Sequence, residues 1–307
     1  MHLNPSLIAT ALAALAMLGS PVQAANTLQS GVLIDRNTQR VLLMSPDSAV
    51  EQVAISSGQT DWTSRDGAMP IAVEGERVLV MRDGAELGKL GYAVLKAGDG
   101  SLVSRASVDL PVPARGLVEE RMGEQFRFTV EADGLRWLHR RQQTQGALMQ
   151  IDGAKGGEKK VSSTEHRGAL SIDWNQGKLA PIDETSVKSS ADTAVEIGKP
   201  TATGPRTFRS VSDGYRLQSE RLDDGRYRWQ LSDAQGARIG ETISEYSYRP
   251  FDVVDGRLLY VTTPRISVTD GKSSISMPTL VAVDLASGKV AWTREIRDTR
   301  YRGPYPS

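Results

Sequence analysis

The stretch Leu280 to Trp292, LVAVDLASGKVAW, decides the fold of this 307-residue chain. It begins with an apolar run of strand type, continues through a polar turn that contains Asp284 and Gly288, and ends in a short strand closed by Trp292. Glycine enters the left-handed region of φ without steric cost, and turns of this kind join antiparallel strands. The stretch therefore predicts a β-hairpin, and the same order of residues recurs upstream.

The recurrence of this hairpin is the main evidence for the architecture. The turn glycines of the successive copies, separated by 42, 77, 59 and 52 residues, are Gly58, Gly100, Gly177, Gly236 and Gly288. The first copy also ends in a tryptophan, Trp62, and the 77-residue interval leaves room for a degenerate copy that begins near Ala147. Repeats of roughly 40–50 residues that form four-stranded sheets are typical of β-propellers. We therefore expect about five to seven four-stranded blades.

The remaining sequence supports an all-β fold. Nine Asp-Gly dipeptides punctuate the chain, and short β-type runs lie between them. One run, Phe126 to Val130, alternates apolar and polar residues, as half-buried strands do. No stretch of the mature chain combines helical periodicity with caps. Residues 25–307 are expected to form a single β-propeller domain.

Two hairpins resemble the repeat of quinoprotein-like (PQQ-like) β-propellers, which reads apolar-x-Asp-x-x-Thr/Ser-Gly-x-x-x-Trp. They are Val283 to Trp292 and Gln52 to Trp62. The resemblance implies that each tryptophan docks on the adjacent blade. The three other copies depart from the pattern at the tryptophan position, where they carry Ser104, Pro181 and Gly240.

Departures from that family's catalytic members favour a non-catalytic type. Catalytic members often carry a vicinal cysteine pair near the quinone, and this chain has no cysteine. The carboxylate and amide set of their calcium site is not found either. No cofactor and no metal are therefore expected.

The N-terminal segment 1–24 is expected to be a cleaved signal peptide. It contains the apolar run Leu7 to Leu18, then a break at Gly19, and small residues at Val22 and Ala24 that suit signal-peptidase cleavage. Twelve helical residues span about 18 Å, well short of a bilayer core of roughly 30 Å. The run is not followed by a lipid-accepting cysteine, and no later stretch approaches spanning length. A periplasmic or secreted protein is predicted.

Composition narrows the possible chemistry further. The 37 basic residues balance the 37 acidic ones, which argues against a nucleic-acid partner. Without cysteine the chain has no disulfides and no thiol nucleophile. His139 and His166 are the only histidines after residue 24, and their spacing matches no zinc motif. No serine-nucleophile or nucleotide-binding motif is found either, so no catalytic residue is assigned.

Two strips rich in arginine and aromatic residues are the candidate partner-binding residues. Such side chains bring area, stacking and directional donors to binding surfaces. They are Arg136, Trp137, Arg140 and Arg141 in one strip, and Arg300, Tyr301, Arg302 and Tyr305 in the C-terminal tail. Segments 142–168 and 186–207, rich in Gly, Ser, Thr and Lys, are expected to be long hairpins or loops at one rim.

These observations favour an exported, monomeric, non-catalytic β-propeller that binds a protein or a small-molecule or saccharide ligand in the cell envelope. One alternative is an enzyme, quinone- or sugar-directed, with its active site in the central funnel. Another is a scaffold of the outer-membrane assembly type.

Overall fold

The structure is a computed structural model, and it describes residues 26–29, 31–83, 86–118, 123–131, 134–145, 160–186, 205–211, 214–264, 266–269 and 272–297. The expected all-β fold is confirmed: apart from one 3-10 turn, Glu184–Ser186, every described element is a strand. No helix in the described part of the chain is long and apolar enough to cross a bilayer.

Among the described strands, five antiparallel sheets of four or five strands are numbered here as blades in chain order. Blade 1 consists of β1 (Asn26–Gln29), β2 (Val32–Asp35), β3 (Arg40–Met44), β4 (Val50–Ala54) and β5 (Thr60–Ser64). Blade 2 consists of β6 (Met69–Glu74), β7 (Arg77–Met81), β8 (Lys89–Lys96) and β9 (Leu102–Asp109). Blade 3 consists of β10 (Glu124–Glu131), β11 (Gly134–Gln145), β12 (Lys160–Asp173) and β13 (Lys178–Ile182).

The last two blades complete the set. Blade 4 consists of β14 (Arg206–Arg209), β15 (Arg216–Arg221), β16 (Tyr227–Ser232) and β17 (Arg238–Ser244). Blade 5 consists of β18 (Phe251–Val254), β19 (Arg257–Val261), β22 (Thr279–Asp284) and β23 (Lys289–Glu295). A separate hairpin, β20 (Ile266–Thr269) and β21 (Lys272–Ile275), lies between β19 and β22 in the sequence. The five blades agree with the lower end of the expected number. The degenerate copy expected near residue 147 lies outside the described residues.

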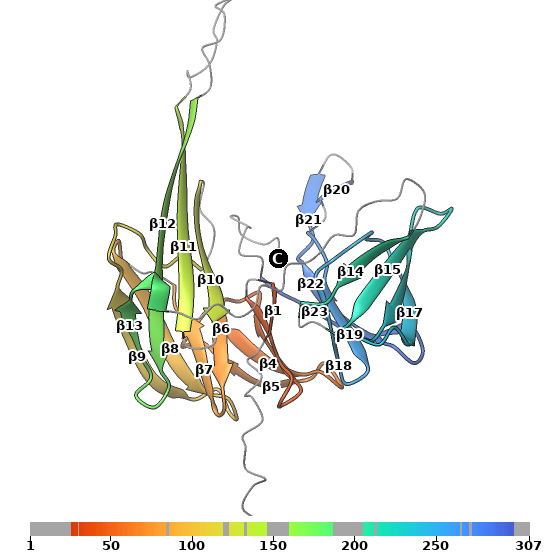
Figure 1. Cartoon of the computed structure of the whole chain (residues 1–307), viewed down its shortest axis with the longest axis horizontal. Helices are drawn as coiled ribbons and strands as arrows, with labels where there is room; N and C mark the ends of the chain where they lie inside the picture. Colours follow the sequence, from red (N-terminus) through yellow and green to blue (C-terminus); the bar gives the residue numbers. More distant parts are fainter. Residues whose placement is uncertain are drawn as a thin grey trace, which may run out of the picture.

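The blades are arranged as an open arc (Figure 1). Four apolar clusters hold the arc together, and each lies mainly between two blades: blades 3 and 2, blades 2 and 1, blades 1 and 5, and blades 5 and 4. In the described part of the chain, none of these clusters joins blade 3 to blade 4. Blades 3 and 4 follow one another in the sequence and nevertheless form the two ends of the arc.

Side-chain alternation explains which blades stand at the ends. In the middle blades, four consecutive residues are buried in β7, from Val78 to Met81, and in β19, from Leu258 to Val261. Such strands are buried on both faces because a blade lies on either side. In the end blades the pattern alternates, as in β15, where Leu217 and Ser219 are buried and their neighbours are exposed. An alternating strand buries one face only.

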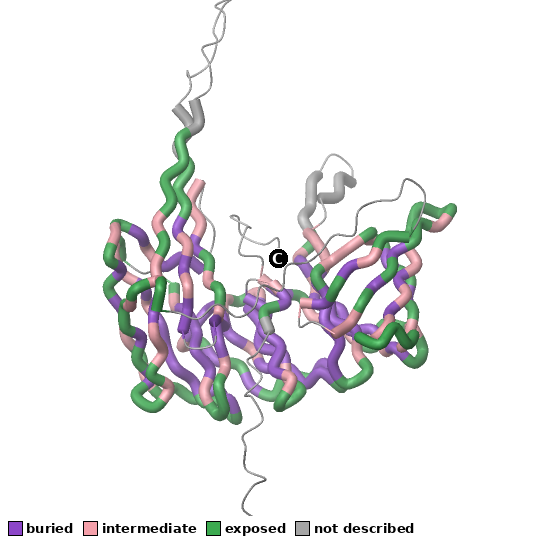
Figure 2. The backbone as a smooth tube through the Cα atoms, viewed as in Figure 1, coloured by how far each residue is buried: buried purple, intermediate pink, exposed green. Residues whose placement is uncertain are grey.

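The burial of residues along the chain follows the same division between middle and end blades. Figure 2 shows buried residues concentrated in the middle of the arc, whereas the long hairpin β11–β12 becomes exposed where it rises away from the blades. Segment 142–168 is expected to form a long hairpin or loop, and its described residues belong to these two extended strands. Most of segment 186–207 and residues 146–159 lie outside the described residues.

Candidate functional site

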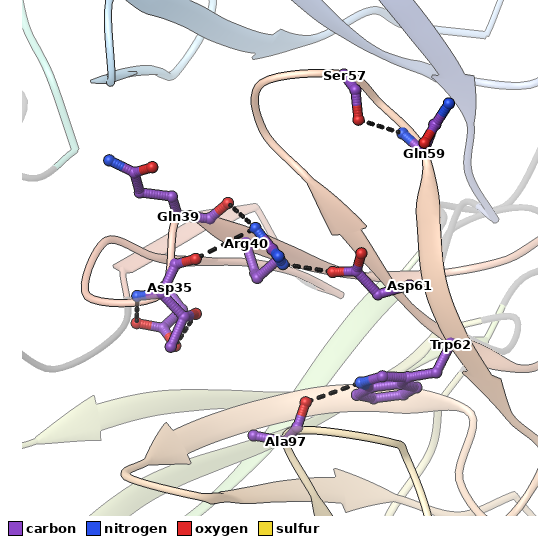
Figure 3. A network of polar contacts seen from close by, with 9 residues as sticks. Asp35, Gln39, Arg40, Ser57, Gln59, Asp61, Trp62 and Ala97 are labelled. Atoms are coloured by element: carbon purple, nitrogen blue, oxygen red, sulfur yellow. Dashed lines mark hydrogen bonds and ion pairs between the residues drawn. The ribbon is translucent and has the colours of Figure 1, made fainter.

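Two tryptophans join the central blades of the arc. The Trp292 indole N–H in β23 donates to the carbonyl oxygen of Ile55 at 2.7 Å, and its ring covers Gly58 in the turn between β4 and β5. The Trp62 indole N–H in β5 donates in the same way to the carbonyl oxygen of Ala97 at 2.8 Å (Figure 3). The Trp62 ring covers Gly100. Each tryptophan therefore docks on the last turn of the next blade, as the resemblance implies.

Glycine is required at both turns for two reasons. Gly58 and Gly100 both have a φ of 70°, a region that other residues enter only with strain. A Cβ atom at Gly58 would lie 2.6 Å from the Trp292 ring, and one at Gly100 would lie 2.4 Å from the Trp62 ring. The close approach of ring and backbone is possible only without a side chain.

The outer junctions use hydroxyl groups at the corresponding place. The Ser104 hydroxyl in β9 donates to the carbonyl oxygen of Gly177 at 3.3 Å, which joins blade 2 to blade 3. The Thr242 hydroxyl in β17 donates to the carbonyl oxygen of Gly288 at 3.0 Å, which joins blade 4 to blade 5. The sequence pattern places Gly240 at this position, but Gly240 lies against Leu285 instead. Thr242 makes the contact because it lies two residues further along β17, on the same face of the strand.

The fifth repeat turn, on blade 4, differs from the others. Gly236 has a φ of 87°, and a Cβ atom added to it would meet nothing within 4 Å. The sequence pattern places Pro181 of β13 at the position of Trp62 and Trp292. Strand pairing sets Pro181 beside Leu170, on the side of blade 3 that faces blade 2, so it does not reach toward blade 4. Among the described residues, no contact of this kind therefore joins blade 3 to blade 4, where a ring of blades would close.

The face of blade 4 that points away from blade 5 is polar. We call it the open face of blade 4. Its central residues, which line a hollow of about 350 Å³ together with Leu231 and Gly236, are Thr207, Arg216, Gln218, Gln230, Ser232 and Arg238. Strand pairing places Gln218 beside Thr207 on one side and Gln230 on the other, and Arg216 beside Ser232. Sequence reasoning does not single out these residues.

The outward face of blade 3 is polar too, but three of its arginines are paired with carboxylates. Arg140 pairs with Glu165 at 2.5 Å, and Arg167 pairs with the same carboxylate at 3.1 Å. Arg136 lies 3.4 Å from Glu131. The hydrogen bonds from Arg140 and then Arg167 hold the pKa of Glu165 below its usual value.

The predicted strip in β11 is divided between the two faces of blade 3. Trp137 is buried between blades 2 and 3, and Arg141 lies on the same side of the sheet, whereas Arg136 and Arg140 lie on the outward face. Alternation along a strand causes this division. The second strip, which contains Arg300, Tyr301, Arg302 and Tyr305, lies outside the described residues.

The two histidines are cross-strand neighbours in blade 3. His139 and His166 face each other in the register of β11 and β12, with ring centroids 6.0 Å apart. His139 is buried, and its Nε2 lies 2.9 Å from Oε1 of Glu124, which in turn lies 3.7 Å from Nε of Arg115. Among the described residues no group of three or more His, Cys, Asp or Glu side chains is placed to hold a metal ion.

A further hollow lies at the rim between blades 1 and 2. It has a volume of about 470 Å³, and its lining includes Arg40, Asp61, Glu76 and Gly98. Arg40 is engaged there, because it forms an ion pair with Asp61, and its guanidinium group also donates to the carbonyl oxygen of Gln39 at 3.4 Å (Figure 3). Its charge is thus compensated, in contrast to that of Arg216 on the open face of blade 4.

Comparisons with known proteins identify no family. No family model matches the chain, and no curated protein matches it in sequence. The quinoprotein-like pattern of the hairpins therefore remains a resemblance.

Solved structures to which the chain is similar include an uncharacterized protein from Listeria monocytogenes, with 10% identity, 92% of this chain and 95% of that chain covered, and a TM-score of 0.28. A putative 6-phosphogluconolactonase from Bacteroides uniformis has 13% identity, with 86% and 87% covered and a TM-score of 0.26. A Synechocystis apocarotenoid oxygenase has 11% identity, with 92% and 73% covered and a TM-score of 0.28. At these values neither family nor activity follows from the similarity.

Proposed function

We propose that the chain is an exported, non-catalytic binding module of the cell envelope, whose ligand or partner enters between blades 3 and 4. The observation that carries the proposal is the polarity of the blade faces. The inner junctions bury apolar clusters, whereas the two faces at the ends of the arc carry arginines, glutamines and glutamates. Such a distribution keeps one junction available to another molecule.

The free-energy cost of burying polar groups favours a junction between blades 3 and 4 that stays open. Leaving one buried polar group without a partner costs about 1–3 kcal/mol. Arg216, Gln218 and Gln230 make no side-chain hydrogen bond or ion pair to the described residues. Packing another blade against them would therefore cost several kcal/mol unless that blade supplied matching partners. The apolar faces of blades 1, 2 and 5 carry no such penalty.

Site-specific labelling tests this proposal cleanly because the chain has no cysteine. Glu220→Cys would place a unique thiol on the open face of blade 4, outside the hollow. Ser57→Cys would place one on an exposed turn of blade 1. Each variant would be screened on peptide and glycan arrays, before and after coupling to a bulky maleimide polymer.

We expect the label at position 220 to abolish binding of the array ligands and the label at position 57 to leave it intact. Binding that survives both labels would refute entry between blades 3 and 4, and an unlabelled protein that binds neither array would count against a binding function. Catalytic turnover of a bound ligand by the pure protein would favour the funnel-enzyme alternative instead. Stable isolation with outer-membrane assembly proteins, insensitive to the label at position 220, would favour the scaffold alternative.

Export is a separate part of the proposal. It rests on the apolar run from Leu7 to Leu18 and on the small residues before Ala25. N-terminal sequencing of the protein from the periplasm or medium of an expressing bacterium should find Ala25 as the first residue. A protein that keeps Met1 and stays in the cytoplasm would contradict it.

A further inference from the structure

We propose that the open face of blade 4 binds an acidic saccharide, a hydroxyl-rich chain that carries carboxylate or sulfate groups. This inference rests on the proposed function, because it names the ligand class of the same opening. It is drawn from the arrangement of arginines and amides across the four strands of the blade.

Three arginines lie in one row across blade 4. Arg209 in β14 is the direct cross-strand partner of Arg216 in β15. Arg216 is paired in turn with Ser232 in β16, and Ser232 with Arg238 in β17. Neighbouring strands are about 4.8 Å apart, so Arg216 and Arg238 are separated by about 10 Å along the row. A single ligand chain can therefore contact all three.

The pairing of Arg209 with Arg216 sets two guanidinium groups on facing strands, and Arg209 has an interaction partner of its own. Like charges directly opposite one another destabilise a sheet. Arg238 is compensated by Glu241, with which it forms an ion pair. Arg216 makes no ion pair or hydrogen bond through its side chain to any residue that the structure describes. An uncompensated guanidinium beside a second one is suited to an anion from outside, since guanidinium binds carboxylate and sulfate groups through paired hydrogen bonds.

The next row of the same face supplies neutral groups. Thr207, Gln218 and Gln230 are consecutive cross-strand partners on β14, β15 and β16. A side-chain amide both donates and accepts hydrogen bonds, as does a hydroxyl group, so this row complements the hydroxyl groups of a sugar. The hollow over these residues has a volume of about 350 Å³. A smaller hollow of about 130 Å³ shares Arg216 with it and is also lined by Arg209 and Tyr215.

The same face is poorly suited to a protein partner. Protein interfaces depend on a few buried aromatic or aliphatic anchors and on pockets that receive them. Across the two rows described above, every outward-pointing side chain is polar, and the exposed apolar residue Ile243 in β17 belongs to neither row. An acidic peptide would satisfy the arginines but would leave the amide row with fewer partners. The face therefore favours a ligand that combines negative charge with many hydroxyl groups.

Isothermal titration with four defined probes tests the proposal: an oligogalacturonate, a heparin-derived oligosaccharide, a neutral dextran oligosaccharide and a poly-glutamate peptide of similar length. We expect at least one of the two acidic saccharides to bind and the neutral one not to bind. Arg216→Gln should weaken that binding about tenfold, because it removes a charge-assisted bidentate contact. Gln218→Ala combined with Gln230→Ala should weaken saccharide binding several-fold and leave poly-glutamate unaffected.

Arg226→Gln is the matched control. Arg226 lies in the β15–β16 turn of the same blade, pairs with Asp224 and lies outside the hollow. Its substitution changes the net charge by the same amount and should leave saccharide affinity unchanged. An equal loss in both variants would show non-specific attraction and overturn the proposal.

The remaining outcomes separate this inference from the proposed function. Equal binding of dextran would overturn recognition by charge, and tighter binding of poly-glutamate would overturn the saccharide class. If no probe binds but array ligands are still displaced by the label at position 220, the saccharide assignment is wrong and the binding function stands. If probes bind without sensitivity to that label, both are wrong.

Discussion

The indole nitrogen of Trp292 lies 2.7 Å from the carbonyl oxygen of Ile55, and this contact joins blade 5, the last in the chain, to blade 1, the first. It places residues 237 positions apart in direct contact at the centre of the arc. The junction also contains the apolar cluster between blades 1 and 5, against which the Trp292 ring packs. Trp292 therefore links the two halves of the arc.

Removal of Trp292 should destabilise the protein strongly. Trp292→Ala should lower the free energy of unfolding by about 3 kcal/mol, through lost packing and an unpaired carbonyl group. Trp292→Phe keeps most of the packing and should cost only about 1 kcal/mol, the value of one hydrogen bond. Urea denaturation measures both. Val290→Ala, an exposed position on the same strand, is the control, and a loss there as large as that of Trp292→Ala would contradict the assignment.

The turn glycines beneath the tryptophans give a second prediction. Gly100→Ala should cost more than the strain of a positive φ alone, because its Cβ atom would lie 2.4 Å from the Trp62 ring. Gly75 has a φ of 55°, and a Cβ atom added to it would meet no other atom within 4 Å, so Gly75→Ala should cost only about 1 kcal/mol of strain. Thermal unfolding of the two variants compares them. Equal losses would show that ring contact at Gly100 adds nothing.

Acid pH should weaken the hairpin that closes blade 5. The Ser287 hydroxyl and N–H donate to the Asp284 carboxylate at 2.7 and 2.8 Å, and these bonds, followed by the ion pair with Arg257, hold the pKa of Asp284 below its usual value. A lowered pKa means that the carboxylate stabilises the folded state at neutral pH. This contribution is lost as the pH falls below about 4 and through the folded-state pKa.

Asp284→Asn should therefore lower the melting temperature at pH 7 and should reduce its decline between about pH 5 and pH 2. The matched control is Asp223→Asn, because Asp223 is an exposed turn carboxylate that makes no side-chain hydrogen bond or ion pair with the described residues. Its pH profile should match that of the wild-type protein. An Asp284→Asn profile parallel to the wild type would contradict the role of the carboxylate.

Amide hydrogen exchange should distinguish the middle of the arc from its ends. Strands β3, β7 and β19 are buried on both faces and should exchange most slowly. Strands β10 and β15 have one exposed face and should open at lower free energy. Mass spectrometry of peptic fragments measures this order. Equal protection of all five blades would indicate a closed ring in solution.

Much of the fold could be predicted from short-range patterns. The hairpin around Gly288 and its copies predict an all-β chain of four-stranded sheets, because turn chemistry and strand alternation act over a few residues. The opening between blades 3 and 4 does not follow from the turns, although its signal is present. Arg216 to Glu220 contains one apolar residue, Leu217, whereas Arg257 to Val261 is continuously apolar after its first residue. Turn spacing reveals the blades, but only the polarity of both strand faces reveals which blades are terminal.

The candidate site is harder to predict than the fold. Arg209 and Arg216 belong to no sequence motif, and they meet only because the turn between β14 and β15 sets the register that makes them cross-strand partners. Trp137 shows the converse, because it stands among arginines in the sequence and is buried between blades in the fold. Both cases depend on the strand register and on the face of the sheet where each side chain lies. Neither can be read from a local sequence motif.

The arginine row predicts that binding and stability oppose each other on blade 4. Arg216→Gln removes one of two like charges that face each other across β14 and β15, so it should raise the free energy of unfolding by about 0.2–1 kcal/mol. Arg226→Gln breaks an ion pair with Asp224 and should not stabilise the protein. Urea denaturation at low ionic strength measures both variants, and added salt should shrink the gain of Arg216→Gln because it screens the repulsion. A loss of stability in Arg216→Gln would mean that this arginine supports the fold, which would contradict a charge that is kept for a ligand.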